Sequence, residues 1–118
     1  MSAHSAAASE PRPVALVTGA SGGIGGAIVR DLARTHRVVA VGRDARALAR
    51  LTASTDAEAQ IVELTDADAI AALASRFERL DVLVHAAEIA EVRSVAQASA
   101  DDWDRKVRIN VLYPALLT

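Results

Sequence analysis

The sequence contains no cysteine, and aromatic residues make up only 3% of its 118 residues. The absence of cysteine excludes a disulfide framework, a cysteine zinc cluster and a thiol nucleophile, and it is typical of a reducing compartment. With so few aromatic residues, the core must be built from Ala, Val, Leu and Ile. No apolar run approaches the ~18 residues of a membrane-spanning helix, and no secretory signal is evident. We therefore expect no membrane partner and a cytoplasmic location.

The charge of the chain is nearly balanced, with 13 basic and 15 acidic side chains and a formal net charge of −2. Such a balance argues against nucleic acid or an anionic membrane surface as the main partner. Hydrophobic residues make up 52% of the sequence, which is enough for one core, and the length suits a single domain. Residues 1–13 are rich in Ala and Ser and are expected to be a disordered lead-in to a domain over residues 14–118.

Short apolar runs alternate with helix-periodic segments along the rest of the chain. The runs predict strands at residues 14–17, 38–41, 61–64 and 82–85, of which the third is the weakest. Strands that alternate with helices imply parallel pairing and right-handed crossovers. Nearly continuous apolar strands imply a sheet covered on both faces. The sequence therefore predicts an α/β fold.

The helices between these strands have recognisable start signals. The first is expected over residues 24–32, the second after an Asp44 cap, and the third after Thr65 or Asp66. The apolar face of the third helix is predicted to comprise Ile70, Leu73, Phe77 and Leu80. Ser99 opens a capping-box pattern before a helical stripe of Trp103, Val107 and Val111, and Pro114 is expected to kink or end that helix.

Residues 18–25 form a glycine-rich turn between the first strand and the first helix. A helix start carries unpaired backbone N–H groups and a partial positive charge. Glycines let a diphosphate approach these groups without a Cβ atom in the way. Taken alone, such a turn is equally compatible with a purely structural role. Its place in a βαβ unit favours a dinucleotide site.

The spacing of Thr18-Gly19, Gly23 and Gly25 resembles the TGxxxGxG loop of the short-chain dehydrogenase/reductase family. Further segments that resemble the family follow in the same order at residues 42–44, 63–66, 82–88 and 103–118. The resemblance implies a Rossmann-like doubly wound parallel sheet with strand order 3-2-1-4, truncated to its N-terminal half. It also implies an NAD(P)-dependent oxidoreductase that acts on a carbonyl or secondary alcohol.

The resemblance also implies which residues bind the cofactor. Where the second strand ends, Gly42 replaces a ribose-binding carboxylate and Arg43 follows, and a guanidinium can hold a phosphate through two hydrogen bonds. We therefore predict NADP(H) in preference to NAD(H), although Arg43 is also compatible with a solvated turn. Glu63 matches a carboxylate that contacts the adenine amino group, or is simply a polar strand end. The predicted cofactor-binding residues are Gly19, Ser21, Gly23, Ile24, Gly25, Arg43, Glu63, Leu64, Ala86 and Ala87.

The sequence departs from the family in two places. Ala86 and Glu88 stand where the family has Asn and Gly beside the cofactor. The family's Tyr-x-x-x-Lys pair cannot form, because the one lysine, Lys106, precedes the one tyrosine, Tyr113. The family's catalytic Ser is also missing. We expect Tyr113 to be a packing residue and Lys106 an exposed helix residue. Asn110 matches the Asn of the catalytic group or is a polar residue on a partly exposed helix, and it can catalyse nothing alone.

A second class of function stays open. The strand at residues 82–85 would be an unpaired apolar edge, and such edges recruit other chains. The chain is then a non-catalytic dinucleotide-binding or interaction module, with a second copy or a partner over that edge. His85 is expected to be packed, and His4 and His36 form no metal site with it. The substrate is not determined by these residues.

Overall fold

Four parallel strands form one sheet in the computed structural model, which describes residues 12–87 and 97–118. The strand order is β3-β2-β1-β4, as predicted. Of the predicted lead-in over residues 1–13, residues 1–11 lie outside the described residues. The elements in chain order are β1 (Val14–Thr18), α2 (Gly23–Leu32), β2 (Arg37–Gly42), α3 (Ala45–Ala53), β3 (Glu58–Ile61), α4 (Ala67–Ser75), β4 (Val82–His85), α5 (Ala100–Val107), the π-helical turn η1 (Arg108–Leu112) and α6 (Tyr113–Leu117).

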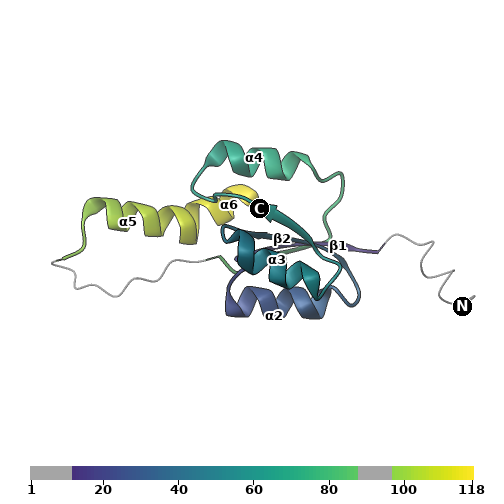
Figure 1. Ribbon diagram of the computed structural model, residues 1–118. Coiled ribbons are helices and arrows are strands. Elements are labelled where there is room, and N and C mark those ends of the chain that lie inside the picture. The colour runs from purple at the N-terminus through teal and green to yellow at the C-terminus, as the bar shows by residue number, and fades with distance from the viewer. Residues whose placement is uncertain (1–11, 88–96) are drawn as a thin grey trace, which may run out of the picture.

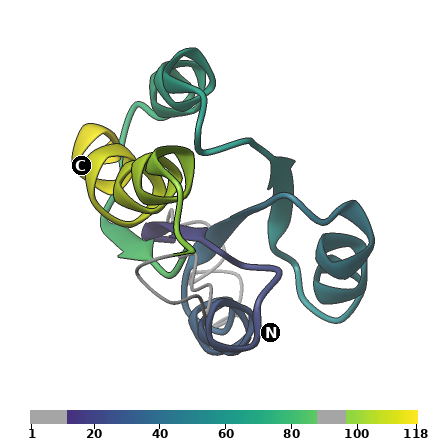
Figure 2. The ribbon, with the colours of Figure 1, turned by 90° about the vertical axis from the view of Figure 1, so that its left-hand side faces the viewer.

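Helices cover both faces of the sheet (Figures 1 and 2), with α2 and α3 on one side and α4 and α6 on the other. Side chains alternate between the two faces along a strand. Ala15 and Val17 of β1 therefore belong to one buried cluster with Leu48 of α3. Leu16 belongs to a second cluster with Leu73 of α4. This two-sided burial explains why β1 and β2 are almost uninterrupted apolar runs.

The prediction for the third strand was wrong in its position. The strand pairs with β2 from Val39 opposite Glu58 to Gly42 opposite Ile61, so it ends where the prediction had it begin. As the edge of the sheet, β3 is largely exposed and carries polar residues, which gives it no apolar pattern. The apolar residues Val62 and Leu64, which prompted the prediction, follow the strand and pack against the second core cluster.

Side-chain caps define the starts of three helices. The Asp44 carboxylate accepts from the backbone N–H groups of Arg46 and Ala47 at 3.0 and 3.1 Å. Asp66, rather than Thr65, caps α4, and Ser99 forms the predicted capping box with Asp102. These caps satisfy N–H groups that have no partner inside the helix.

Helix α4 is shorter than its predicted apolar face. It ends at Ser75, and the chain then turns through Arg76. Phe77 still packs against the second core cluster, but Leu80 is 37% exposed. The apolar periodicity continues beyond the end of α4 because Phe77, in the turn, packs against the same core cluster as the helix.

Pro114 was expected to kink or end the last helix, but the helix continues through it as α6, after a π-helical turn. In the π-helical turn η1, the N–H of Tyr113 donates to the carbonyl of Arg108, five residues earlier. A proline has no N–H to donate and its ring crowds the preceding turn. The wider turn places Pro114 near the start of α6, where its missing N–H costs little. Helix α5 projects away from the sheet, while α6 lies beside α4 (Figure 1).

Asp81 joins the start of β4 to the start of β1. Its carboxylate accepts from the backbone N–H of Val14 at 2.8 Å and from Nε of Arg79 at 3.1 Å. The Val14 hydrogen bond, followed by the one from Arg79, holds the pKa of Asp81 below its ordinary value. A carboxyl group with a lowered folded-state pKa stabilises the fold above its unfolded pKa of about 4, and this stabilisation disappears as the pH falls through the folded pKa.

We therefore expect Asp81→Asn to flatten the acid limb of the stability profile. The variant should be less stable than the wild type near neutral pH, and the difference should shrink as the pH falls below about 4. Urea denaturation at a series of pH values measures this directly. A constant difference across the acid range would show that the Asp81 charge does not carry the effect.

Candidate functional site

A cavity of about 320 Å³ opens at the carboxyl ends of the strands. Every residue predicted to bind the cofactor lines this cavity, although these residues come from four separate segments of the chain. In doubly wound sheets, this end of the strands is where ligands bind. The prediction missed further lining residues, namely Gly22, Gly42, Val62 and Ile109.

The glycine turn is held in place by close backbone contacts. Gly19 has a φ of +63°, a left-handed conformation that favours glycine. A Cβ atom on Gly19 would lie 2.5 Å from backbone atoms of Ala86 and Ala87, and one on Gly25 would lie 2.1 Å from the carbonyl oxygen of Gly19. The turn closes through a 3.1 Å hydrogen bond from the Gly22 N–H to that same oxygen. These glycines are therefore needed by the protein itself.

Gly23 differs from its neighbours because nothing in the described chain lies within 4 Å of a Cβ atom built on it. It is the first residue of α2 and lines the cavity. The protein's own packing therefore does not require a glycine at this position. Open space in front of a helix start suits a ligand that approaches the backbone closely.

Helix α2 begins at the cavity without a side-chain cap. Its N-cap residue is Gly22, and its first turn carries no acidic residue, whereas α3, α4 and α5 are each capped by a side chain. The first-turn N–H groups and the positive end of the helix dipole thus face the cavity, where they favour an anion. This geometry is what a pyrophosphate needs.

Apolar residues form another wall of the cavity. Val62 and Leu64 are half-buried there and pack against the second core cluster. The N–H of Val62 donates to the carbonyl of Gly42 at 3.1 Å, which continues the pairing of β2 and β3 beyond the strand. Ile24, at the start of α2, is 75% exposed in the cavity lining. This wall offers a flat aromatic ring an apolar surface.

The charged rim of the cavity consists of Arg43 and Glu63. Nη1 of Arg43 lies 3.8 Å from Oε2 of Glu63. The adjoining Gly42 accommodates Ser21, because a Cβ atom on Gly42 would lie only 2.9 Å from the Ser21 hydroxyl oxygen. At the end of β2, the rim therefore has a guanidinium and a hydroxyl group beside Gly42, which carries no carboxylate, while the Glu63 carboxylate comes from the segment after β3.

Thr18 anchors the segment after β4 that contributes Ala86 and Ala87 to the cavity lining, and the sequence analysis gave it no binding role. Its hydroxyl oxygen accepts from the N–H of Ala87 at 3.3 Å and donates to the carbonyl of Val84 at 3.4 Å. Thr18 is buried, so these bonds fix the chain after β4 beside Gly19. The sequence signal that could have indicated this role is a threonine at the end of a buried, otherwise apolar strand. Glu88, the other departure noted above, lies outside the described residues.

Asn110 lies in η1, is exposed, and does not line the cavity. Tyr113 is buried, as predicted, and its hydroxyl accepts from Nη1 of Arg108 at 3.1 Å. The Arg108 pKa is raised, chiefly by the hydrogen bond that its Nε donates to Asp104. Tyr113 therefore serves packing and points its hydroxyl group at a cation.

Two minor predictions were wrong. Lys106 is half-buried rather than exposed, because its ammonium lies 5.7 Å from the ring centre of Trp103 and a cation is attracted to an aromatic face. His85 is exposed rather than packed, with Nε2 lying 2.9 Å from the Thr118 hydroxyl oxygen. The β4 register with β1 gives the reason, since His85 is the last residue of an outer strand.

Across residues 12–87 and 97–118, no group of three or more His, Asp or Glu side chains is placed to hold a metal ion. In the same part of the chain, no helix has the length and apolar character needed to cross a bilayer.

Comparisons with known proteins agree with this geometry. An uncharacterised short-chain type dehydrogenase/reductase of Sinorhizobium fredii is 39% identical over 100 residues, which cover 83% of this chain and 40% of that protein. A short-chain dehydrogenase from Streptomyces avermitilis has a TM-score of 0.84 at 34% identity, over 92% of this chain and 43% of that one. A short-chain dehydrogenase from Sphingobium yanoikuyae, solved in complex with NADPH, has a TM-score of 0.79 at 31% identity, over 89% of this chain and 45% of that one.

The chain thus spans less than half the length of these relatives. The sequence model described as short chain dehydrogenase matches residues 13–118, which include every strand and the whole cavity lining. The chain therefore belongs to the short-chain dehydrogenase family.

Proposed function

We propose that this chain forms the NADP(H)-binding part of an oxidoreductase that acts on a carbonyl or a secondary alcohol. One observation carries the proposal: a single cavity brings together the glycine turn, the uncapped start of α2, an apolar wall and Arg43. The α2 amide groups would hold the pyrophosphate, and Val62 and Leu64 would flank the adenine. When bound, the cofactor supplies or accepts a hydride.

The open space at Gly23 supports a close ligand. Backbone packing accounts for Gly19 and Gly25, but nothing within 4 Å accounts for Gly23. A glycine that the protein's own packing does not require, at the start of an uncapped helix, is consistent with a pyrophosphate bound against the backbone. The NADPH complex of the Sphingobium yanoikuyae relative supports the same class of ligand.

The preference for NADP(H) rests on the rim. A carboxylate at the end of the second strand would bind the ribose hydroxyls and repel a 2′-phosphate, but this chain has Gly42 there. The exposed Arg43 guanidinium can form paired charge-assisted hydrogen bonds with the phosphate, and the Ser21 hydroxyl group is a second donor nearby.

We expect Arg43→Ala to weaken NADPH binding about tenfold and to leave NADH binding within about twofold. Hydrogen bonds to charged groups contribute roughly 1.5–3 kcal/mol, and the exposure of Arg43 places its contribution at the low end. Isothermal titration calorimetry with each dinucleotide tests this without requiring turnover. Arg50→Ala, an exposed arginine in the last turn of α3, is the control. An equal loss for both dinucleotides would contradict the specificity claim.

Binding is the suitable readout because we expect no hydride transfer by this chain alone. The cofactor's hydride chemistry needs a proton donor, and the order of Lys106 and Tyr113 precludes a Tyr-x-x-x-Lys pair. Tyr113 is also buried against Arg108. Asn110 matches the family's helix Asn but lies outside the cavity lining.

The second candidate function is an interaction module. Among the described strands, β4 pairs with β1 alone and lies at the edge of the sheet, and an edge strand can recruit a further strand. Trp103, Val111 and Leu116 add exposed apolar surface, at 52%, 62% and 57% exposure. A folded chain that binds neither NADPH nor NADH in the titration would favour this second function over the first.

A further inference from the structure

The only partner of the Arg43 guanidinium within residues 12–87 and 97–118 is Glu63, at 3.8 Å. Arg43 follows β2 and Glu63 follows β3, and both line the same cavity. Their side chains are 63% and 49% exposed. The two charges therefore meet at the cavity rim, where a ligand can reach both.

Glu63 is held more firmly than Arg43. One carboxylate oxygen of Glu63 accepts from the N–H of Thr65 at 3.4 Å, and its backbone carbonyl accepts from the N–H of Asp66 at 3.1 Å. Asp66 in turn caps α4. Because Glu63 is fixed to its own turn, the long Arg43 side chain adjusts to the carboxylate rather than the reverse.

We propose that Glu63 is a specificity-determining residue that competes with a 2′-phosphate for Arg43. The inference rests on the proposed function, in which Arg43 binds that phosphate. The phosphate carries a charge of about −1.5 to −2, so a carboxylate that shares the same guanidinium both occupies the donor and repels the ligand. Glu63 thus moderates the NADP(H) preference that Arg43 creates, and it positions Arg43 at the rim when no ligand is bound.

The competition acts on one part of the ligand only. A ligand without the 2′-phosphate leaves the Arg43–Glu63 ion pair intact, so removing that ion pair does not change its affinity. Surface ion pairs are weak and are screened by salt. We therefore expect an effect that is modest, selective for the 2′-phosphate and sensitive to ionic strength. A contact between Glu63 and the adenine ring would instead change the affinity for both kinds of ligand.

The test is Glu63→Gln, which removes the charge and keeps the shape of the side chain. Calorimetric titration of adenosine 2′,5′-bisphosphate and of adenosine 5′-monophosphate at low ionic strength measures the two affinities. The variant should bind the bisphosphate about three- to tenfold more tightly and the monophosphate within about twofold of the wild type. In an Arg43→Ala background the gain should fall to about twofold or less, since the guanidinium is no longer there to be released.

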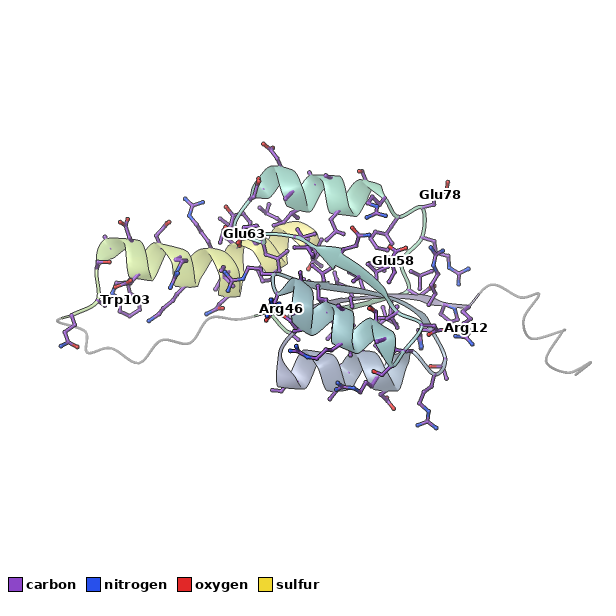
Figure 3. All side chains as sticks on the ribbon, viewed as in Figure 1. Arg12, Arg46, Glu58, Glu63, Glu78 and Trp103 are labelled. Carbon is purple, nitrogen blue, oxygen red and sulfur yellow. The ribbon has the colours of Figure 1, made fainter. Side chains whose placement is uncertain are left out.

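The chain offers a matched control in Glu58 at the other end of β3 (Figure 3). Glu58 pairs with Arg76 at the same distance of 3.8 Å, and its side chain is similarly exposed at 45%. Glu58 does not line this cavity. Glu58→Gln should therefore leave both affinities unchanged, and thermal melts should show that both Gln variants are folded.

Each other outcome counts against the inference. Equal changes for both ligands would assign Glu63 to the adenine and overturn the competition, while the proposed function would stand. Weaker bisphosphate binding by Glu63→Gln would show that Glu63 assists rather than opposes the phosphate. Failure of the folded wild-type chain to bind either ligand would overturn the proposed function, and this inference with it.

Discussion

Gly25→Ala is expected to destabilise the fold by about 3 kcal/mol or more. An added Cβ atom would lie 2.1 Å from the carbonyl oxygen and 2.7 Å from the carbonyl carbon of Gly19. Both are backbone atoms of a turn that is itself pressed against Ala86 and Ala87, so neither side can yield without displacing β1 or β4. Such a loss is a large fraction of the roughly 5–15 kcal/mol that stabilises a typical domain.

Urea denaturation followed by circular dichroism measures this loss, and Gly23→Ala is the matched control. It adds the same methyl group two residues earlier in the same helix, where nothing lies within 4 Å. Its free energy of unfolding should stay within about 1 kcal/mol of the wild type, because alanine also has the higher helix propensity. Equal stability of the two variants would show that the contact between Gly25 and Gly19 is relieved by a shift of the turn.

Three of the four strands and the helix starts could be predicted because local signals are strong there, whereas the strand order came from the resemblance to the family. The apolar runs of β1 and β2 are buried between helices, and that of β4 is half-buried. Asp44 and Asp66 combine cap chemistry with the start of an apolar period. The edge strand β3 could not be placed in this way. Its residues 58–60 are polar or small, and its pairing is determined by β2 rather than by its own pattern.

The location of the cavity could be predicted from the sequence, but the prediction of its lining residues was incomplete. The TGxxxGxG spacing located the turn, but the reason for Gly42 is the contact with Ser21 from a distant segment. Ile109 of η1 lines the cavity although it lies more than twenty residues from the other lining segments, and the adjoining α6 packs beside α4. Thr18 secures the chain after β4 through hydrogen bonds to residues more than sixty positions away. Contacts of this kind depend on tertiary packing, which no local pattern contains.

Gly23→Ala is also expected to weaken binding of both NADPH and NADH on the order of 100-fold, with the fold intact. The new methyl group would extend into the cavity at the uncapped start of α2. A pyrophosphate displaced from this position loses hydrogen bonds from the first-turn amide groups. Hydrogen bonds to a charged group contribute roughly 1.5–3 kcal/mol each, so the loss of one or two accounts for this factor.

This expectation is distinguishable from that for Arg43→Ala, because the pyrophosphate is common to both dinucleotides and the 2′-phosphate is not. Titration of both ligands against the two variants therefore separates the two ends of the site. Gly23→Ala should lower both affinities by the same factor, while its urea transition stays close to that of the wild type. Unchanged affinities would mean that the open space at Gly23 is not where the pyrophosphate lies, and the cavity would then need a ligand that avoids the start of α2.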